Sequence, residues 1–123
     1  MFTQNKAFSS YSVNDLEKAR QFYGQTLGLA VKDTPEGGLD LTVNGVTLFV
    51  YPKPNHQPAT FTVLNFFVAN IDQAVADLTK LGVVFEHYDG MPIDDKGIMR
   101  GQGPLIAWFK DPAGNILSVI QEK

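Results

Sequence analysis

The sequence predicts an α+β fold made of two similar modules, each in the order strand, helix and three further strands. Three observations favour it: two amphipathic helical segments, strand-forming segments over most of the remaining chain, and an internal repeat. With 123 residues, 44% of them apolar, the chain has the size and composition of one domain with its own core. We expect this single domain, residues 1–123, to consist of module 1 (about 1–52), a proline-rich linker (53–59) and module 2 (about 60–123).

Two segments show the helical spacing of apolar residues. The first begins at Asn14 or Asp15, either of which can cap a helix N-terminus, and Gly28 ends it. The second begins at Asn70 and stops at Gly82. The apolar stripes consist of Leu16, Ala19, Tyr23 and Leu27 in the first segment, and of Ile71, Ala74, Val75, Leu78 and Leu81 in the second. Because each helix has one apolar face, each should cover a sheet.

β-Branched and aromatic residues predict the strands. These are expected over residues 7–13, 38–43, 46–51, 61–68, 83–87, 105–110 and 116–121. Asn44-Gly45 predicts a two-residue hairpin turn, and Asp-Pro-Ala-Gly-Asn at 111–115 predicts a type I turn followed by a left-handed residue. Two strand pairs are therefore expected to be hairpins.

An internal repeat relates the two halves of the chain. Residues 13–19 align with residues 68–74 at a separation of 55, and each segment has the pattern of a strand end, a cap and a helix start. Leu27-Gly28-Leu29 then matches Leu81-Gly82-Val83 at a separation of 54, so the alignment needs a slip of one residue. The repeat indicates a duplicated module.

Composition and charge exclude several classes of function. Thirteen acidic and ten basic residues give a net charge of −3, with no cluster of Lys or Arg, which argues against nucleic-acid binding. The chain has no cysteine and two histidines, His56 and His87, so thiol chemistry is excluded and imidazole chemistry is limited. The N-terminus is polar and no long apolar segment follows it. We therefore expect a soluble, cytoplasmic protein with no nucleic-acid or membrane partner.

Two segments resemble the vicinal oxygen chelate superfamily, which includes glyoxalase I, bleomycin resistance proteins and extradiol dioxygenases. The first is SVNDLEKARQFY at residues 12–23, followed by Leu27-Gly28-Leu29, and the second is FKDPAGN at residues 109–115. Together with the duplicated order of elements, the resemblance covers nearly the whole chain. It implies paired βαβββ modules whose sheets curve around a shared cleft, commonly within a homodimer.

In metal-bearing members of that superfamily, the first and last strands of each module hold one divalent cation. The resemblance places the first-strand ligand positions on Phe8 and Val63, and the last-strand positions near Phe49 and on Ser118. These four side chains offer one neutral hydroxyl, whereas such a cation needs carboxylate or imidazole donors. We therefore expect no metal centre, no cofactor, and none of the metal-dependent isomerisation or ring cleavage of the superfamily.

Strand alternation extends these positions to the other side chains that should line the cleft. The expected lining is Phe8, Ser10, Ser12, Thr47, Phe49, Tyr51, Val63, Asn65, Phe67, Ile116, Ser118 and Ile120. Trp108 is a further candidate, with core packing as its alternative. Aromatic rings with scattered hydroxyls and one amide are typical of a small-molecule pocket. The alternative is that these residues pack a closed barrel or a dimer interface.

The segment from 86 to 103 is long, polar and rich in glycine. Met91, Ile98, Met99 and Arg100 are candidates for a movable cover over the cleft, and a solvated surface loop is the alternative. Glu86, His87 and Asp89 form no convincing metal cluster, because adjacent side chains on a strand point to opposite faces. His56, in the linker, is expected to be exposed to solvent.

The sequence favours a metal-free binding protein similar to bleomycin resistance proteins, a homodimer that holds an aromatic or amphipathic small molecule. The alternative is an enzyme, a glyoxalase-like lyase or isomerase or a dioxygenase relative with a non-standard site, for which Asp40 is the one candidate carboxylate. A structural or regulatory dimer with a filled cleft is the third possibility.

Overall fold

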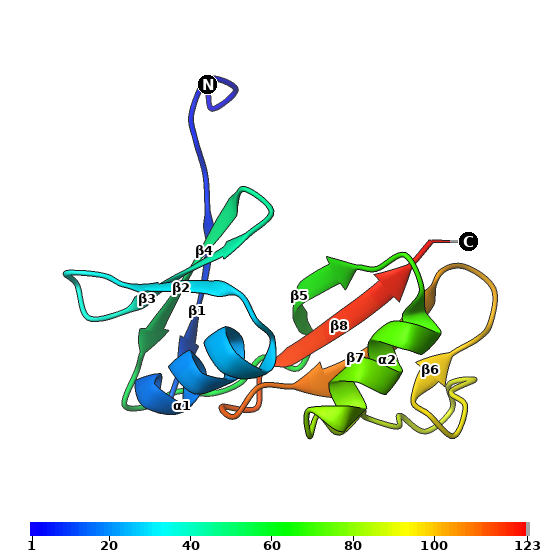
Figure 1. Cartoon of the computed structure of the whole chain (residues 1–123). Helices are drawn as coiled ribbons and strands as arrows, with labels where there is room; N and C mark the ends of the chain where they lie inside the picture. Colours follow the sequence, from blue (N-terminus) through cyan, green and yellow to red (C-terminus); the bar gives the residue numbers. More distant parts are fainter. Residues whose placement is uncertain (123) are drawn as a thin grey trace. The chain divides into compact units, whose positions relative to one another are not determined.

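The computed structural model describes residues 1–122. The chain forms two compact units, one from Met1 to Gln57 and one from Pro58 onward. The division falls within the segment 53–59 that the proline pattern predicts as a linker. Each unit, called module 1 and module 2 below, contains a four-stranded mixed sheet with helical structure beside it (Figure 1).

The sheet of module 1 has the strand order β1-β4-β3-β2. Its strands are β1 (Ser9–Val13), β2 (Ala30–Asp33), β3 (Leu39–Val43) and β4 (Val46–Pro52). Strand β1 pairs with β4 in parallel, and the other two pairs are antiparallel. The parallel pair requires a long connection, which the helical segment and the β2-β3 strands provide.

Module 2 repeats this order as β5-β8-β7-β6. Its strands are β5 (Thr62–Phe67), β6 (Ile98–Met99), β7 (Leu105–Lys110) and β8 (Ile116–Gln121). Strand β5 is parallel to β8, while β7 is antiparallel to both β8 and β6. The two sheets therefore have the same topology, which confirms the α+β fold of two βαβββ modules.

The helices begin with equivalent caps. Asp15 precedes α1 (Leu16–Arg20) and accepts a hydrogen bond from the Lys18 amide, and Asn70 precedes α2 (Ile71–Lys80) and accepts one from the Gln73 amide. The cap residues have nearly identical backbone angles, φ/ψ of −140°/107° and −138°/104°. Of the two residues predicted as the first cap, the structure uses Asp15. This agreement confirms the repeat at 55-residue spacing.

The first helix continues as a π-helix, η1 (Gln21–Thr26). Here the Leu27 amide donates to the carbonyl of Phe22, five residues earlier, so this turn holds one residue more than an α-helical turn. Gly28 and Gly82 then end the two helical segments with φ of 73° and 94°, values that favour glycine. The extra residue in module 1 explains why the repeat spacing falls from 55 to 54 across the helix.

The helix-facing sides of the two sheets form the two cores. In module 1, the hydroxyl of Tyr11 on β1 donates to that of the fully buried Tyr23 on η1, at 2.9 Å. In module 2, α2 contacts β7 and β8. The buried apolar side chains are Val13, Ala19, Tyr23, Leu39, Leu41, Leu48 and Val50 in module 1, and Ile71, Val75, Val83, Phe85, Ile98, Ala107, Phe109, Leu117 and Val119 in module 2. Buried and less buried side chains alternate along β3, β4 and β7, as predicted.

The strand prediction fails at the equivalent edge of both sheets. Strand β2 is not predicted, because it is short and two of its residues, Lys32 and Asp33, are charged. The predicted strand 83–87 is wrong: Phe85 forms only an isolated bridge with Phe109, and β6 pairs with Ala107 and Ile106 farther along the same edge of β7. The chain leaves the sheet between residues 87 and 97. Two short segments, one at Phe85 and one at β6, therefore lie along the edge of β7 where one continuous strand is predicted.

The predicted turns are confirmed. Asn44 and Gly45 both have positive φ, 47° and 83°, as a type I′ hairpin turn requires. In the 111–115 turn, Gly114 has φ of 86°, and the Asp111 carboxylate accepts hydrogen bonds from the amides of Ala113 and Asn115. Among residues 1–122, no helix is long and apolar enough to cross a membrane.

Candidate functional site

Each sheet has a second face that points away from its helix, here called the open face. Residues paired across strands share a face, so the register determines which side chains lie there. In module 1, Ser10, Phe49 and Asp40 form one row across β1, β4 and β3. In module 2, Asn65, Ser118 and Trp108 form one row across β5, β8 and β7. Trp108, whose face the sequence leaves open, therefore lies on the open face.

Aromatic side chains dominate the open face of module 1. The rings of Phe49 and Tyr51 stack at a centroid distance of 5.9 Å and an interplanar angle of 17°. Phe8 is 71% exposed at the start of the module, and Thr47 is exposed on β4. A partly exposed stack of this kind presents flat apolar surface on which another planar group can pack.

A hydrogen bond joins Ser12 and His56 beside this stack. The Ser12 Oγ and His56 Nδ1 atoms lie 2.7 Å apart, and Ser12 pairs across the sheet with Tyr51. His56 is half-buried, so the expectation that it is exposed to solvent is wrong. The linker folds back beyond β4, with the Lys53 amide bonded to the carbonyl of Val13, and this brings the imidazole to β1.

The row in module 2 combines an aromatic ring with neutral polar groups. The fully buried Ser118 Oγ donates to Asn65 Oδ1 at 2.5 Å, and the Trp108 indole donates to Thr62 Oγ1 at 3.1 Å. The register of β5 on β8 shifts between Thr62 and Leu64, which interrupts the alternation at the half-buried Val63. Thr62 thereby shares the open face with Asn65, a placement the sequence pattern does not predict.

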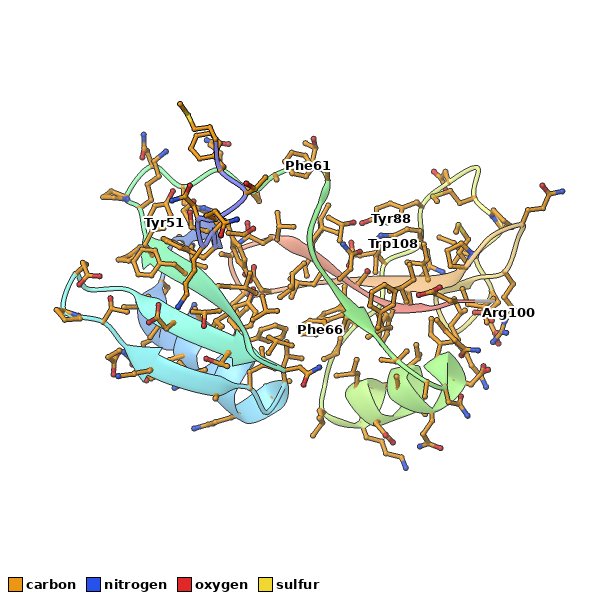
Figure 2. All side chains as sticks on the ribbon, turned by 90° about the horizontal axis from the view of Figure 1, so that it is seen from above. Tyr51, Phe61, Phe66, Tyr88, Arg100 and Trp108 are labelled. Carbon is orange, nitrogen blue, oxygen red and sulfur yellow. The ribbon has the colours of Figure 1, made fainter. Side chains whose placement is uncertain are left out.

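Tyr88 is a site residue that the sequence analysis missed. Its ring packs edge-on against Trp108 at a centroid distance of 5.6 Å, and Figure 2 shows the two side by side. The Tyr88 hydroxyl is buried and has no hydrogen-bond partner within residues 1–122. Burial, with a smaller contribution from Glu86, raises the pKa of Tyr88, so this phenol stays protonated at neutral pH. Because it lies in an irregular segment, no periodic pattern marks it.

The predicted movable cover in the 86–103 segment is not what the structure contains. Ile98 is fully buried in β6, and Arg100 forms ion pairs with Asp94 and with Asp72 on α2. These contacts hold both residues to the helix-covered side of module 2. Met91 remains 39% exposed in the preceding turn. The part of the segment around β6 is therefore built into the module, because Ile98 belongs to the core and Arg100 is tied to α2.

Asp94 organises the turn that leads into β6. Its Oδ1 atom accepts hydrogen bonds from the amides of Lys96 and Ile98, both at 2.9 Å, and Oδ2 accepts one from Arg100 Nε. Although its partial burial acts to raise the pKa of Asp94, the hydrogen bonds from Arg100 and the two amides outweigh it, and the pKa is lowered. The carboxylate thus stabilises the fold above its unfolded-state pKa.

Replacing Asp94 with alanine is expected to lower the free energy of unfolding by about 1 kcal/mol at pH 7, mostly through the two lost amide contacts. Because the folded-state pKa is depressed, the contribution of Asp94 should be complete above its unfolded-state pKa and be lost as the pH falls through the lower folded-state pKa. Urea unfolding of both proteins between pH 2.5 and pH 7 measures this, in steps of about 0.5. Asp95→Ala, at the neighbouring exposed carboxylate, is the matched control; a pH-independent difference for Asp94→Ala would contradict the assignment.

The donor set of the open faces does not fit a divalent cation. The four positions at which the resemblance predicts metal ligands carry two phenylalanines, one valine and Ser118, whose hydroxyl is already bonded to Asn65. Within residues 1–122, no three His, Asp or Glu side chains are grouped as a metal site requires. No step of a mechanism is therefore assigned to a metal here.

The residue pattern of the chain matches a known family over most of its length. Residues 7–119 match the Glyoxalase/Bleomycin resistance protein/Dioxygenase superfamily. The chain belongs to this superfamily. The match includes both modules, and it confirms the resemblance to the vicinal oxygen chelate proteins. No curated protein sequence matches the chain.

Solved structures with the same fold match nearly the whole chain. A glyoxalase family protein from Bacillus anthracis is 24% identical with a TM-score of 0.73, and each chain is covered completely. TnmS3, an antibiotic binding protein from Streptomyces sp. CB03234, is 24% identical with a TM-score of 0.75, covering 100% of this chain and 99% of that one. The fosfomycin resistance protein FosX from Listeria monocytogenes is 15% identical with a TM-score of 0.73, covering 98% and 94%. At these identities the likeness shows the fold alone.

Proposed function

We propose that this superfamily member binds an aromatic or amphipathic small molecule without a metal, as a homodimer in the cytoplasm. The observation that carries the proposal is the open-face row of module 2, where Trp108 lies beside Ser118 and Asn65. In a metal-bearing relative the Ser118 position would hold a charged ligand, and here it holds a neutral hydrogen bond. Such a row offers a ring for stacking and polar atoms for orientation, but no strong acid, base or Lewis acid.

Two further features support the binding function. The Phe49-Tyr51 stack gives module 1 an aromatic open face as well, so both repeats present the same kind of surface. TnmS3, which shares the fold, is described as an antibiotic binding protein. The ligand class that we propose here is a planar antibiotic or metabolite. Rings bind planar ligands through stacking and apolar burial.

Replacing Trp108 with alanine is expected to lower the affinity for the ligand by about tenfold to a hundredfold, because one stacked aromatic contact is lost. The ligand is first sought by thermal shift with a library of aromatic antibiotics and metabolites, and its affinity is then measured by calorimetry with and without EDTA. Phe2→Ala, at a ring that is 76% exposed near the N-terminus, is the matched control and should leave the affinity unchanged. EDTA should also leave it unchanged, since no metal takes part.

Other outcomes would contradict this proposal. A library without any stabilising compound would argue against small-molecule binding, and stoichiometric metal in protein purified without chelators would argue against the metal-free site. If the wild type and Trp108→Ala bind the ligand with equal affinity, the open-face row of module 2 does not form the binding site.

A glyoxalase-like enzyme is the second candidate, and the Ser12-His56 hydrogen bond is the observation that favours it. The bond fixes an imidazole beside the Phe49-Tyr51 stack, where it can accept a proton from a bound compound. Asp40 lies in the same row as Phe49 and is half-buried. Turnover of a bound compound that is lost in His56→Asn or in Asp40→Asn would favour this candidate over simple binding.

A further inference from the structure

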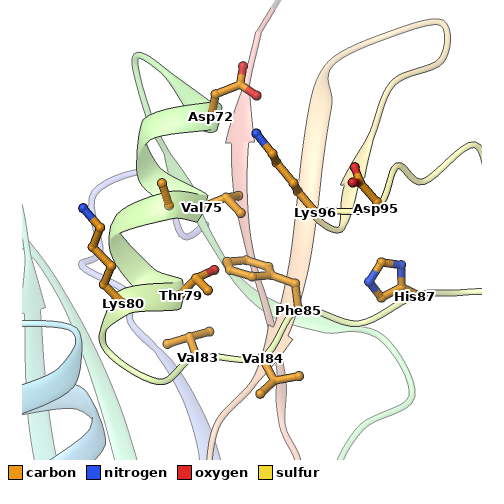
Figure 3. Close-up of a pocket in the computed structure, with 11 residues that line it drawn as sticks. Asp72, Val75, Thr79, Lys80, Val83, Val84, Phe85, His87, Asp95 and Lys96 are labelled. Carbon is orange, nitrogen blue, oxygen red and sulfur yellow. The ribbon is translucent and has the colours of Figure 1, made fainter.

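A separate pocket of about 620 Å³ lies on the helix-covered side of module 2 (Figure 3). Its walls are the outer side of α2, the segment 83–87 and the turn at 95–96. The floor is apolar and consists of the buried side chains Val75, Val83 and Phe85. None of the open-face residues lines it. A volume of this size is within the usual range for small-molecule sites, roughly 300–1,000 Å³.

The walls of this pocket are fixed by contacts within module 2. Arg100 bridges Asp72 at the start of α2 and Asp94 in the turn, and so ties the turn to the helix. Gly97 has φ of 95°, and a Cβ atom there would lie 2.6 Å from Phe85 Cβ, so the backbone at Gly97 lies close against Phe85. A pocket whose shape exists before binding loses less conformational entropy when it takes a ligand.

The charges at the rim favour an anion. Lys80 and Lys96 line the pocket, and neither has an ion pair within the described part of the chain, whereas the Asp72 carboxylate is engaged by Arg100. His87, a third nitrogen-bearing side chain, is exposed at the same rim, and Asp95 supplies the opposing charge. Figure 3 shows Lys96 on the side of α2 that faces the turn, whereas the Lys80 side chain extends from the opposite side of the helix. Lysine ammonium groups beside apolar surface suit a ligand with one acidic group.

We propose that this pocket is a second binding site, for a small amphipathic carboxylic acid. The apolar body of the acid lies on the floor formed by Val75, Val83 and Phe85, and its carboxylate pairs with the ammonium group of Lys96, while Lys80 adds positive charge at the other end of the rim. The site is independent of the open-face function, because it shares no residue with the rows of either module.

Octanoate is the probe for this site, and the measurement is a ¹⁵N-HSQC titration up to about 10 mM, which detects Kd values in the millimolar range. Amide shifts are expected in α2 and in residues 83–87. The double variant Lys80→Gln/Lys96→Gln should bind octanoate at least about tenfold more weakly, as expected when charge-assisted contacts are lost. Lys6→Gln/Lys18→Gln, which removes the same charge from exposed lysines of module 1, should bind like the wild type.

A second variant tests the location by filling the pocket. Ala76 is an exposed residue of α2 that lines it, so Ala76→Trp should abolish the octanoate shifts without disturbing the core. Ala30→Trp, at an exposed alanine of β2, is its control. Trp108→Ala should leave octanoate binding intact, which separates this site from the proposed open-face function. Absence of shifts, shifts confined to β5 and β8, or unchanged affinity in both pocket variants would overturn the proposal.

Discussion

Replacing Phe109 with alanine is expected to lower the free energy of unfolding by about 3–5 kcal/mol, the usual cost of truncating a fully buried aromatic residue. Phe109 is 1% exposed, and its ring meets that of Phe85 at a centroid distance of 5.6 Å. It also pairs across the sheet with the buried Leu117. Because all these neighbours are fixed by backbone pairing, the surrounding core cannot collapse to fill the space, and the cavity adds to the lost burial.

Urea unfolding at neutral pH measures this effect. Phe61→Ala deletes the same ring from a side chain that is 68% exposed, and it should change stability by less than about 0.5 kcal/mol. Phe109→Leu, which keeps most of the apolar volume, should fall between the two. A loss below about 1 kcal/mol for Phe109→Ala would show that the core of module 2 is not organised around this ring.

Replacing Asp111 with alanine is expected to cost about 3 kcal/mol, since a buried turn loses several hydrogen bonds to a carboxylate at once. Asp111 is 4% exposed. Its Oδ1 atom accepts from the amides of Ala113 and Asn115, and its Oδ2 atom accepts from the Asn115 side chain at 3.0 Å. Alanine would leave these donors without their acceptor, and a buried polar group without a hydrogen-bond partner lowers the free energy of unfolding.

The same unfolding measurement tests this prediction. Asp111→Asn retains an acceptor oxygen and should lose less than Asp111→Ala, while Asp89→Ala removes an exposed loop carboxylate as the control. Ligand affinity should be unchanged in folded Asp111→Asn, because the side chain serves the turn between β7 and β8. A large loss of ligand affinity with normal stability would instead assign the motif at 109–115 to binding.

Local chemistry is what made much of the fold predictable. Asp15 and Asn70 cap their helices because their side chains accept hydrogen bonds from backbone amides. Asn44, Gly45 and Gly114 form their turns because few other residues tolerate positive φ. The one-residue slip in the repeat, in contrast, results from the π-helix η1, which the sequence pattern does not predict. Whether an extra residue is absorbed in a loop or in a helix depends on packing, here on the burial of Tyr23.

The candidate site was predictable where strands are regular and unpredictable where they are not. Alternation places Ser10, Phe49, Asn65 and Ser118 on one face of their sheets, and the register agrees. It fails at Val63, where the register shifts, and it carries no information about Tyr88 or His56, which reach the open faces from irregular segments. Such segments are positioned by long-range contacts that no local pattern encodes.

The sequence by itself determined the superfamily and the duplicated βαβββ order, because caps and turn residues are local properties. It also predicts that Phe8, Val63, Ser118 and a residue near Phe49 stand at the metal-ligand positions. Only the tertiary structure decided that Arg100 ties a turn to α2, that His56 bonds Ser12 and that an apolar pocket with a basic rim lies beside Phe85. These features join residues that are distant in the chain. Their geometry follows from the packing of whole elements, and local sequence preference does not specify it.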